Sequence, residues 1–234
     1  MPFQSIEPRR LYRQIADQVR TLIRNGEFKP GSRLPPERDL AREFGVSRPS
    51  LREALIALEV EGWVDVRIGS GIYVRAVPPN GGAGVAADAL AGPFELLRAR
   101  HVIESECAAL AAKSAKRAQL RSIVEALDEM DRDLDARRSP LAADRQFHLR
   151  IAEATGNGVL VHVTRLLWDE RGGELFRQLE DHYDSPGLWR AANAEHRVVL
   201  KSIVTHDADG ARAAMQRHLD QACKRFSKGW NGRH

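Results

Sequence analysis

In this 234-residue sequence, one aspartate and three of the eight histidines occupy positions from which their side chains would point into a helical core. Asp144 and His148 are four residues apart, so on a helix they share one face, and that face also carries apolar residues. His196 and His218 likewise share their helical faces with aliphatic residues and methionine. Polar groups are costly to bury without partners. A single metal ion would satisfy all four, and nitrogen-rich ligation suits Zn²⁺, with Ni²⁺ or Mn²⁺ as alternatives.

Hydrogen-bonded core histidines are the competing interpretation of these positions. For any one histidine taken alone, that interpretation is the better one. For Asp144 and His148 alone, an ion pair across one helical turn explains the spacing as well as a metal does. The residues by themselves leave both interpretations open.

A second group of polar residues has the spacing of a DNA-reading helix. Arg48 and Arg52 are four residues apart on one predicted face, while the leucines that follow face the opposite way. Arginine binds guanine edges or phosphate, and the short side chains of Ser47 and Ser50 suit phosphate oxygens. Arg38, at the start of the preceding predicted helix, can point to the same DNA phosphate backbone. An ordinary solvated face is the alternative, and the grouping of these residues weighs against it.

The elements around these arginines predict a winged helix-turn-helix. Apolar periodicity indicates a helix over 11–23, and a short helix follows Pro35-Pro36 and ends at Gly45. Ser47 caps a further helix that runs to about Glu61. The period then changes to that of two strands around a glycine turn over 63–75, as expected for a wing.

The remaining chain separates into a linker and a helical region. Residues 77–92 are rich in glycine, proline and alanine, which is typical of a linker. Residues 93–230 have helical patterning interrupted by turn signals. We therefore expect a mainly α protein with a DNA-binding domain over 1–76 and a second, all-α domain over 93–230.

Composition limits the class of protein. Charged residues make up 29% and hydrophobic residues 43%, which suits a folded soluble protein, and the net charge of +4 weakly favours a polyanionic partner. The sequence has no apolar run long enough for a bilayer and no apolar signal core near Met1, so we expect a cytoplasmic protein that does not enter a membrane. Its two cysteines, Cys107 and Cys223, suit reduced core thiols.

The N-terminal region closely resembles the winged-helix domain of the GntR family of regulators. The resemblance spans about residues 9–75 and rests on ordered strings: LPPERDLA from Leu34, FGVSRPSLREAL from Phe44, LEVEGWV from Leu58 and GSGIYV from Gly69. It implies that double-stranded DNA is contacted by Arg38, Ser47, Arg48, Ser50, Arg52 and Gly69. The sequence departs from the family at Ile68, where a polar or basic residue is common, so a polar contact from that position is not expected.

Residues 93–226 are similar to the FCD effector domain found in the FadR-type branch of that family. The matching strings are RHVIE from Arg100, DRQFH from Asp144, Gly156-Asn157, Glu195-His196 and MQRHL from Met215. The resemblance implies an antiparallel helical bundle with the metal ligands Asp144, His148, His196 and His218.

Residues near the expected metal suit a small organic acid as effector. Arg100 would clamp a carboxylate, and Asn157 would serve as a polar partner, although capping of a helix is an equally good role for Asn157. The stretch 167–176 more loosely resembles hexuronate-responsive regulators, which favours a sugar acid stacked on Trp168 and near Arg171. Core or dimer packing is at least as good an account of Trp168.

Two other classes of protein compete with a regulator. A metalloenzyme would use the same ligands to activate water, but the sequence has no HExxH helix and no glutamate placed by motif as a general base. A purely architectural DNA binder would leave most of the chain without a role. We expect no enzyme activity. The predicted function is a homodimeric repressor on an inverted-repeat operator, released by its effector.

Overall fold

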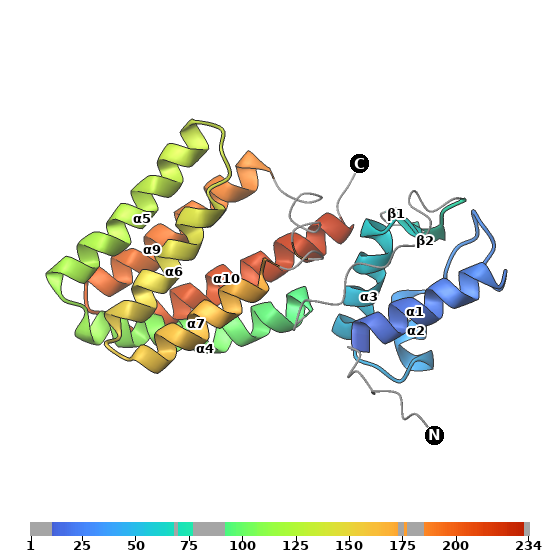
Figure 1. The fold of residues 1–234 in the computed structure, drawn as a ribbon, viewed down its shortest axis with the longest axis horizontal. Helices are drawn as coiled ribbons and strands as arrows, with labels where there is room; N and C mark the ends of the chain where they lie inside the picture. The colour runs from blue at the N-terminus through green and yellow to red at the C-terminus, as the bar shows by residue number, and fades with distance from the viewer. Residues whose placement is uncertain (1–10, 68–69, 77–91, 173–175, 177–184, 232–234) are drawn as a thin grey trace, which may run out of the picture. The chain divides into compact units, whose positions relative to one another are not determined.

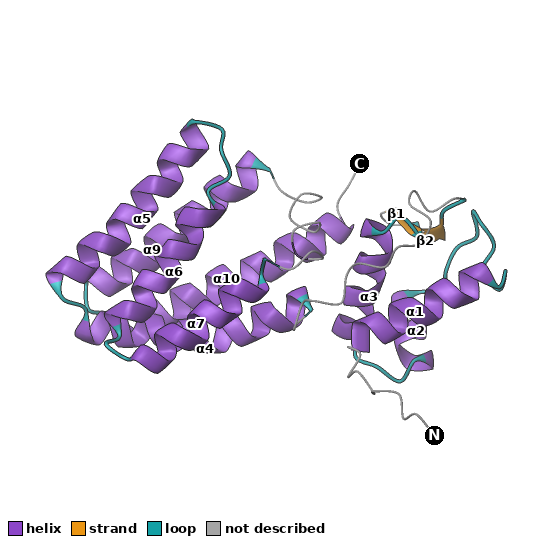
Figure 2. Cartoon of the chain, viewed as in Figure 1, coloured by secondary structure: helices purple, strands orange, loops and turns teal. Residues whose placement is uncertain are grey.

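The computed structural model describes residues 11–67, 70–76, 92–172, 176 and 185–231 (Figure 1). Helices make up most of these residues, and the described strands form one two-stranded sheet (Figure 2). The chain divides into two compact units, and the main body of the second begins at Glu95. Within the described residues, no helix has both the length and the apolar character needed to cross a membrane. The mainly α fold class is confirmed.

The first unit contains α1 to β2. Its elements are α1 (Leu11–Arg24), α2 (Glu37–Glu43), α3 (Arg48–Val60), β1 (Val64–Arg67) and β2 (Gly71–Val74). The second unit contains the remaining helices, which are α4 (Pro93–Ser114), α5 (Arg117–Asp135), α6 (Leu141–Ala154), α7 (Gly158–Glu170), α9 (Pro186–Val204) and α10 (Ala208–Asn231).

The turn between α2 and α3 depends on Gly45 and on the cap of α3. Gly45 has a φ of +64°, a left-handed conformation that glycine adopts without steric cost, and it lets the chain reverse after α2. Ser47 then caps α3 by accepting a hydrogen bond from the backbone N–H of Ser50 at 3.2 Å. Leu51 and Leu55 are fully buried on the inner face of α3. This arrangement leaves the first turn of α3 exposed.

The wing is an antiparallel hairpin that packs on the helices. Val64 pairs with Val74, and both are buried together with Trp63 and Ile72. Trp63 therefore anchors the hairpin on the helices, whereas Val66 is only half-buried because it lies nearer the turn. Ile68 and the wing-tip Gly69 lie outside the described residues.

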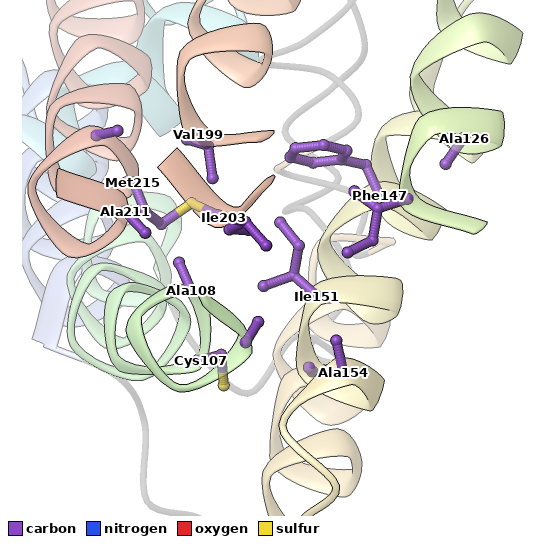
Figure 3. Packing of buried hydrophobic residues seen from close by; sticks show 14 of the residues in the cluster. Cys107, Ala108, Ala126, Phe147, Ile151, Ala154, Val199, Ile203, Ala211 and Met215 are labelled. Atoms are coloured by element: carbon purple, nitrogen blue, oxygen red, sulfur yellow. The ribbon is translucent and has the colours of Figure 1, made fainter. Parts of the chain in front are cut away.

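The core of the second unit joins side chains from separate helices (Figure 3). Phe147 and Ile151 from α6 face Val199 and Ile203 from α9, and Met215 from α10 lies beside them. Small residues also belong to this buried cluster, namely Ala108 and Ala111 on α4, Ala152 and Ala154 on α6, and Ala211 and Ala214 on α10. This packing brings the inner faces of α6, α9 and α10 together.

Within the described residues, Cys107 and Cys223 are not joined in a disulfide. Cys107 is buried, and burial raises the pKa of its thiol to about 11. The thiol is therefore protonated at neutral pH and acts as a small apolar side chain.

Truncation of a core leucine should test this packing. Leu127 on α5 is buried in the core, and Leu127→Ala should lower the free energy of unfolding by about 2–5 kcal/mol, because it removes buried methyl groups and leaves a cavity. Urea unfolding followed by circular dichroism measures the change. Val124→Ala is the matched control on the exposed face of α5 and should change it by less than about 0.5 kcal/mol. Equal effects of the two substitutions would contradict the packing described for α5.

Candidate metal centre

Four side chains from three helices converge inside the second unit. Asp144 and His148 come from α6, His196 from α9 and His218 from α10, and all four are buried. One nitrogen from each histidine lies within 4.8 Å of the others. The structure therefore brings together every residue of the predicted ligand set.

The distances between these groups fit ligands of one ion. The Nε2 atoms of His196 and His218 are 3.1 Å apart. Asp144 Oδ1 lies 3.3 Å from His196 Nε2 and 3.6 Å from His148 Nε2. Ligands bound at about 2.1 Å from a common ion are separated by roughly 3.0–3.4 Å, depending on whether the geometry is octahedral or tetrahedral.

Two of these atoms have no hydrogen-bonding partner. Asp144 Oδ1 and His148 Nε2 are buried and make no hydrogen bond within the described part of the chain. Such orphaned acceptors are rare in proteins and often mark an ion site. Three imidazole nitrogens and one carboxylate oxygen suit Zn²⁺, and an octahedral ion would keep positions for other ligands. The residues present thus fit a divalent transition metal.

Two glutamates orient the histidine rings from outside. Glu104 Oε2 lies 2.6 Å from His148 Nδ1, and Glu195 Oε2 lies 2.9 Å from His218 Nδ1. Carboxylates in this position fix the ring and increase its basicity as a ligand. Glu195 is itself paired with Arg225 at 2.7 Å. Helical spacing does not indicate a role for Glu104 or Glu195, although each stands in a string that carries the family resemblance.

Charge in the centre is unevenly distributed. Burial and the neighbouring His218 hold the pKa of His196 well below its usual value, and burial and the neighbouring His148 do the same for His218. Burial also lowers the pKa of His148, but Glu104 and Asp144 outweigh it and the net shift is upward. Burial raises the pKa of Asp144, yet the facing histidines and Arg171 hold it well below its usual range. Of the three histidines, His148 is therefore the one whose surroundings favour the protonated ring.

Arg100, Trp168 and Arg171 lie beside the candidate metal ligands. Arg100 is buried, donates to Glu104 at 2.7 Å and stacks 4.0 Å from the centroid of the Trp168 ring. Trp168 Nε1 donates to the same glutamate at 3.1 Å. Arg171 lies 4.7 Å from that ring and donates to Asp144 Oδ2 at 3.0 Å. These three predicted effector residues are therefore joined around the centre by hydrogen bonds and by cation–π contacts with Trp168.

Asn157 lies apart from this network. Its side chain caps α7 by accepting hydrogen bonds from the backbone N–H groups of Val159 and Leu160. Trp168 stands eleven positions after Asn157, which is about 16 Å along the helix. Capping, one of the two roles suggested by the sequence, is the role that the structure shows.

The predicted DNA-binding residues cluster around the start of α3. The side chains of Arg38 and Arg48 are 82% and 61% exposed, while Arg52 is 24% exposed. Ser47 and Ser50 lie 2.8 Å apart through their hydroxyl groups in the first turn. These residues present cationic and polar groups at the end of a helix that a helix-turn-helix inserts into the major groove.

Each of the two units matches a known protein family. Residues 11–74 match "Bacterial regulatory proteins, gntR family", and residues 95–221 match the FCD domain. The chain belongs to the GntR family of bacterial regulators and has an FCD domain at its C-terminal side. It is a DNA-binding transcriptional regulator of this kind.

Full-length relatives support that assignment. The Uxu operon transcriptional regulator of Escherichia coli K12 is 39% identical over 93% of this chain and 87% of its own length. The Exu regulon transcriptional regulator of the same strain is 38% identical over 92% and 83%. Among solved structures, E. coli McbR/YncC has the same fold, with a TM-score of 0.54 and 21% identity over 95% of this chain and all of that chain. The relatives are regulators, which confirms that this chain is not an enzyme.

Metal affinity should depend on pH because metal and proton compete for His148. The pKa of His148 is raised, so its ring is protonated below that value and the ion must displace a proton. The affinity for Zn²⁺ should therefore fall about tenfold for each pH unit below the raised pKa and level off above it. Competition with a chromophoric chelator between pH 6 and pH 8 measures this.

Glu104→Gln tests the cause of this pH dependence, because it removes the carboxylate that raises the pKa of His148. Its affinity at pH 8 should be about 10–100-fold weaker, because the ring loses its orienting partner, and the pH dependence should move to lower pH. His162, an exposed histidine on α7, provides the control substitution His162→Ala. An affinity independent of pH in the parent protein would contradict the assignment of His148 as a ligand.

Proposed function

We propose that this chain is a homodimeric repressor in the cytoplasm whose affinity for an inverted-repeat DNA operator is controlled by a sugar acid bound beside the metal centre. The observation that carries the proposal is the position of Arg171, a cationic side chain paired with the ligand Asp144 in the unit attached to a DNA-binding domain.

The metal would be held by Asp144, His148, His196 and His218, and when bound it would supply positive charge to a carboxylate. Arg171 offers a second cation next to it, at the end of α7, and is less deeply buried than Arg100. A guanidinium and a metal ion together suit one carboxylate group. The effector therefore takes its carboxylate contacts from this side of the centre.

Arg100 and Trp168 take supporting roles in this proposal. The Nε and Nη2 atoms of Arg100 are both directed at Glu104, so its guanidinium holds that carboxylate against His148. Trp168 is buried, with its ring against both arginines and its N–H on Glu104. The network transmits a change at Arg171 to the histidines, and the effector does not need to reach Arg100.

The choice of a sugar acid rests on similarity. The looser resemblance of the stretch 167–176 is to hexuronate-responsive regulators, and the Uxu and Exu regulators are among the relatives of the whole chain. A metal centre with an adjacent arginine also suits smaller hydroxy acids. Sugar acids and hydroxy acids are accordingly both included in the test.

On the DNA, α3 is proposed to enter the major groove, with contacts from Arg38, Ser47, Arg48, Ser50 and Arg52 and a wing contact from Gly69. Effector binding would change the relative stability of two arrangements of the dimer, and linkage requires that DNA and effector affinities then change together. Release of the operator by effector is the proposed direction.

Homodimer formation is supported by apolar side chains on the outer faces of α4 and α7. These two helices are joined by the Trp168–Glu104 hydrogen bond. The exposed apolar residues are Val102 and Leu110 on α4 and Val159 and Leu166 on α7. A second copy of the chain would cover such a surface, and two-fold symmetry would match an inverted repeat.

A thermal-shift screen tests the effector. Zinc-loaded protein should gain roughly 5–10 °C in melting temperature with a sugar acid at about 100 times its dissociation constant, because ligand bound only to the native state stabilises it. The panel includes hexuronates, L-lactate and dicarboxylates. The shift should be lost in Arg171→Ala and in His196→Ala, and kept in His162→Ala, which alters an exposed histidine. A shift retained in His196→Ala would place the effector away from the metal.

Sedimentation analysis tests the dimer. Leu166→Glu places a charge in the exposed apolar surface of α7 and should convert the dimer to monomer, because an unpaired charge is costly to bury at an interface. Arg165→Glu is the control, a charge reversal at the adjacent exposed position. A dimer unaffected by Leu166→Glu would exclude this face as the interface.

A further inference from the structure

Glu37 is a carboxylate placed among the arginines of the DNA-binding face. It is the first residue of α2, follows Pro36, and its side chain is only 16% exposed. It accepts hydrogen bonds from Arg52 at 2.9 Å and 3.0 Å through Nη2 and at 3.3 Å through Nε. Arg48 Nε contacts the same carboxylate at 3.4 Å. A negative charge at a surface that binds phosphate lowers general affinity for DNA, so its presence there needs a reason.

The geometry of the Arg52 contact is that of a fixed fork. Both carboxylate oxygens of Glu37 face the Nε and Nη2 atoms, so the guanidinium plane is held relative to α3. The three contacts use Nε and Nη2, so Nη1 takes no part in them. The Nη1 end of the guanidinium is thus left to donate to O6 and N7 of guanine.

Arg48 is held differently. It has one longer contact with Glu37 and a side chain that is 61% exposed, against 24% for Arg52. A loosely held, exposed arginine suits phosphate, which accepts donors from many directions. Glu37 thus holds Arg52 by three hydrogen bonds and Arg48 by one longer contact, so the side chain of Arg52 is the more restricted of the two.

We propose that Glu37 is a positioning residue for sequence readout: it orients Arg52 toward a guanine edge and gives up general DNA affinity for sequence specificity. This inference rests on the proposed insertion of α3 into the major groove. Glu37 itself contacts no base and acts through Arg52.

The proposal predicts opposite effects of Glu37→Gln on two kinds of DNA. Loss of the negative charge should tighten binding to a scrambled duplex about two- to fivefold at low salt. Loss of the fixed fork should weaken binding to the cognate duplex, so that the ratio of the two affinities falls at least about fivefold. A residue that only braces α2 against α3 would change both affinities in the same direction.

Two further variants separate charge from geometry. Glu37→Asp keeps the charge but is one methylene shorter, so the specificity ratio should fall while affinity for scrambled DNA stays the same. Asp39→Asn removes a charge from the same helix, but from a residue that pairs with Arg38 and Arg42. It should tighten binding to both duplexes and leave their ratio unchanged.

The experiment uses the full chain without effector. Wild-type protein selects its cognate duplex from a random-sequence pool, and fluorescence anisotropy then gives the affinity of each variant for that duplex and for a scrambled one of equal length. Repeating the selection with Glu37→Gln should give a motif with reduced preference at a guanine position. In Arg52→Lys, which lacks the fork, adding Glu37→Gln should lower the ratio no further.

An unchanged specificity ratio in both Glu37 variants would overturn the proposal, as would an equal loss of affinity for both duplexes. If wild-type protein selected no sequence at all, the proposed readout by α3 would fail, and the role of Glu37 would fail with it. A selected motif that is the same for wild type and Glu37→Gln would overturn the role of Glu37 alone.

Discussion

The burial of Asp144, His148, His196 and His218 at one point is the constraint on which the second unit depends. Three helices must bring these side chains within a few ångströms of each other, and all four side chains are buried. Two glutamates hold the outer nitrogens of His148 and His218, so α4 also becomes part of the same polar network. Because buried polar groups are costly when unsatisfied, a displacement of one helix affects the ligands on the others.

In both units a carboxylate fixes the orientation of another functional side chain. In the helical unit Glu104 and Glu195 orient imidazole rings, and in the winged helix Glu37 orients Arg52. Each carboxylate removes rotational freedom from a flexible or two-sided group before a ligand arrives, which lowers the entropic cost of binding. In the helical unit the network extends from His148 through Glu104 to Trp168 and Arg171, and this continuity would let an effector at the proposed position beside Arg171 act on the candidate metal ligands. A network of this kind suits a regulator, in which binding at one site must alter another.

Local sequence signals predicted most of the fold, and helical spacing predicted which faces were buried. Ser47 as a cap and Gly45 as a turn depend on neighbouring residues only, so both could be read from the sequence. Helical spacing predicted that Asp144 and His148 lie on one face. The prediction that His196 and His218 belong to the same metal site depended on the resemblance to a family. Pairings such as Glu104 with His148 or Glu37 with Arg52 join different helices, and one-dimensional periodicity carries no information about them. Asn157 had two roles consistent with its sequence, and only its position at the far end of α7 separates them.

X-ray absorption spectroscopy of the zinc-loaded protein tests the central claim most directly, because it reports the atoms around the ion. The account predicts one ion per chain with three imidazole nitrogens and at least one oxygen at about 2.0–2.2 Å. It also predicts loss of one imidazole in His218→Ala with retained helical content by circular dichroism. A first shell without imidazole, or one unchanged by His218→Ala, would show that these four residues do not form the metal site.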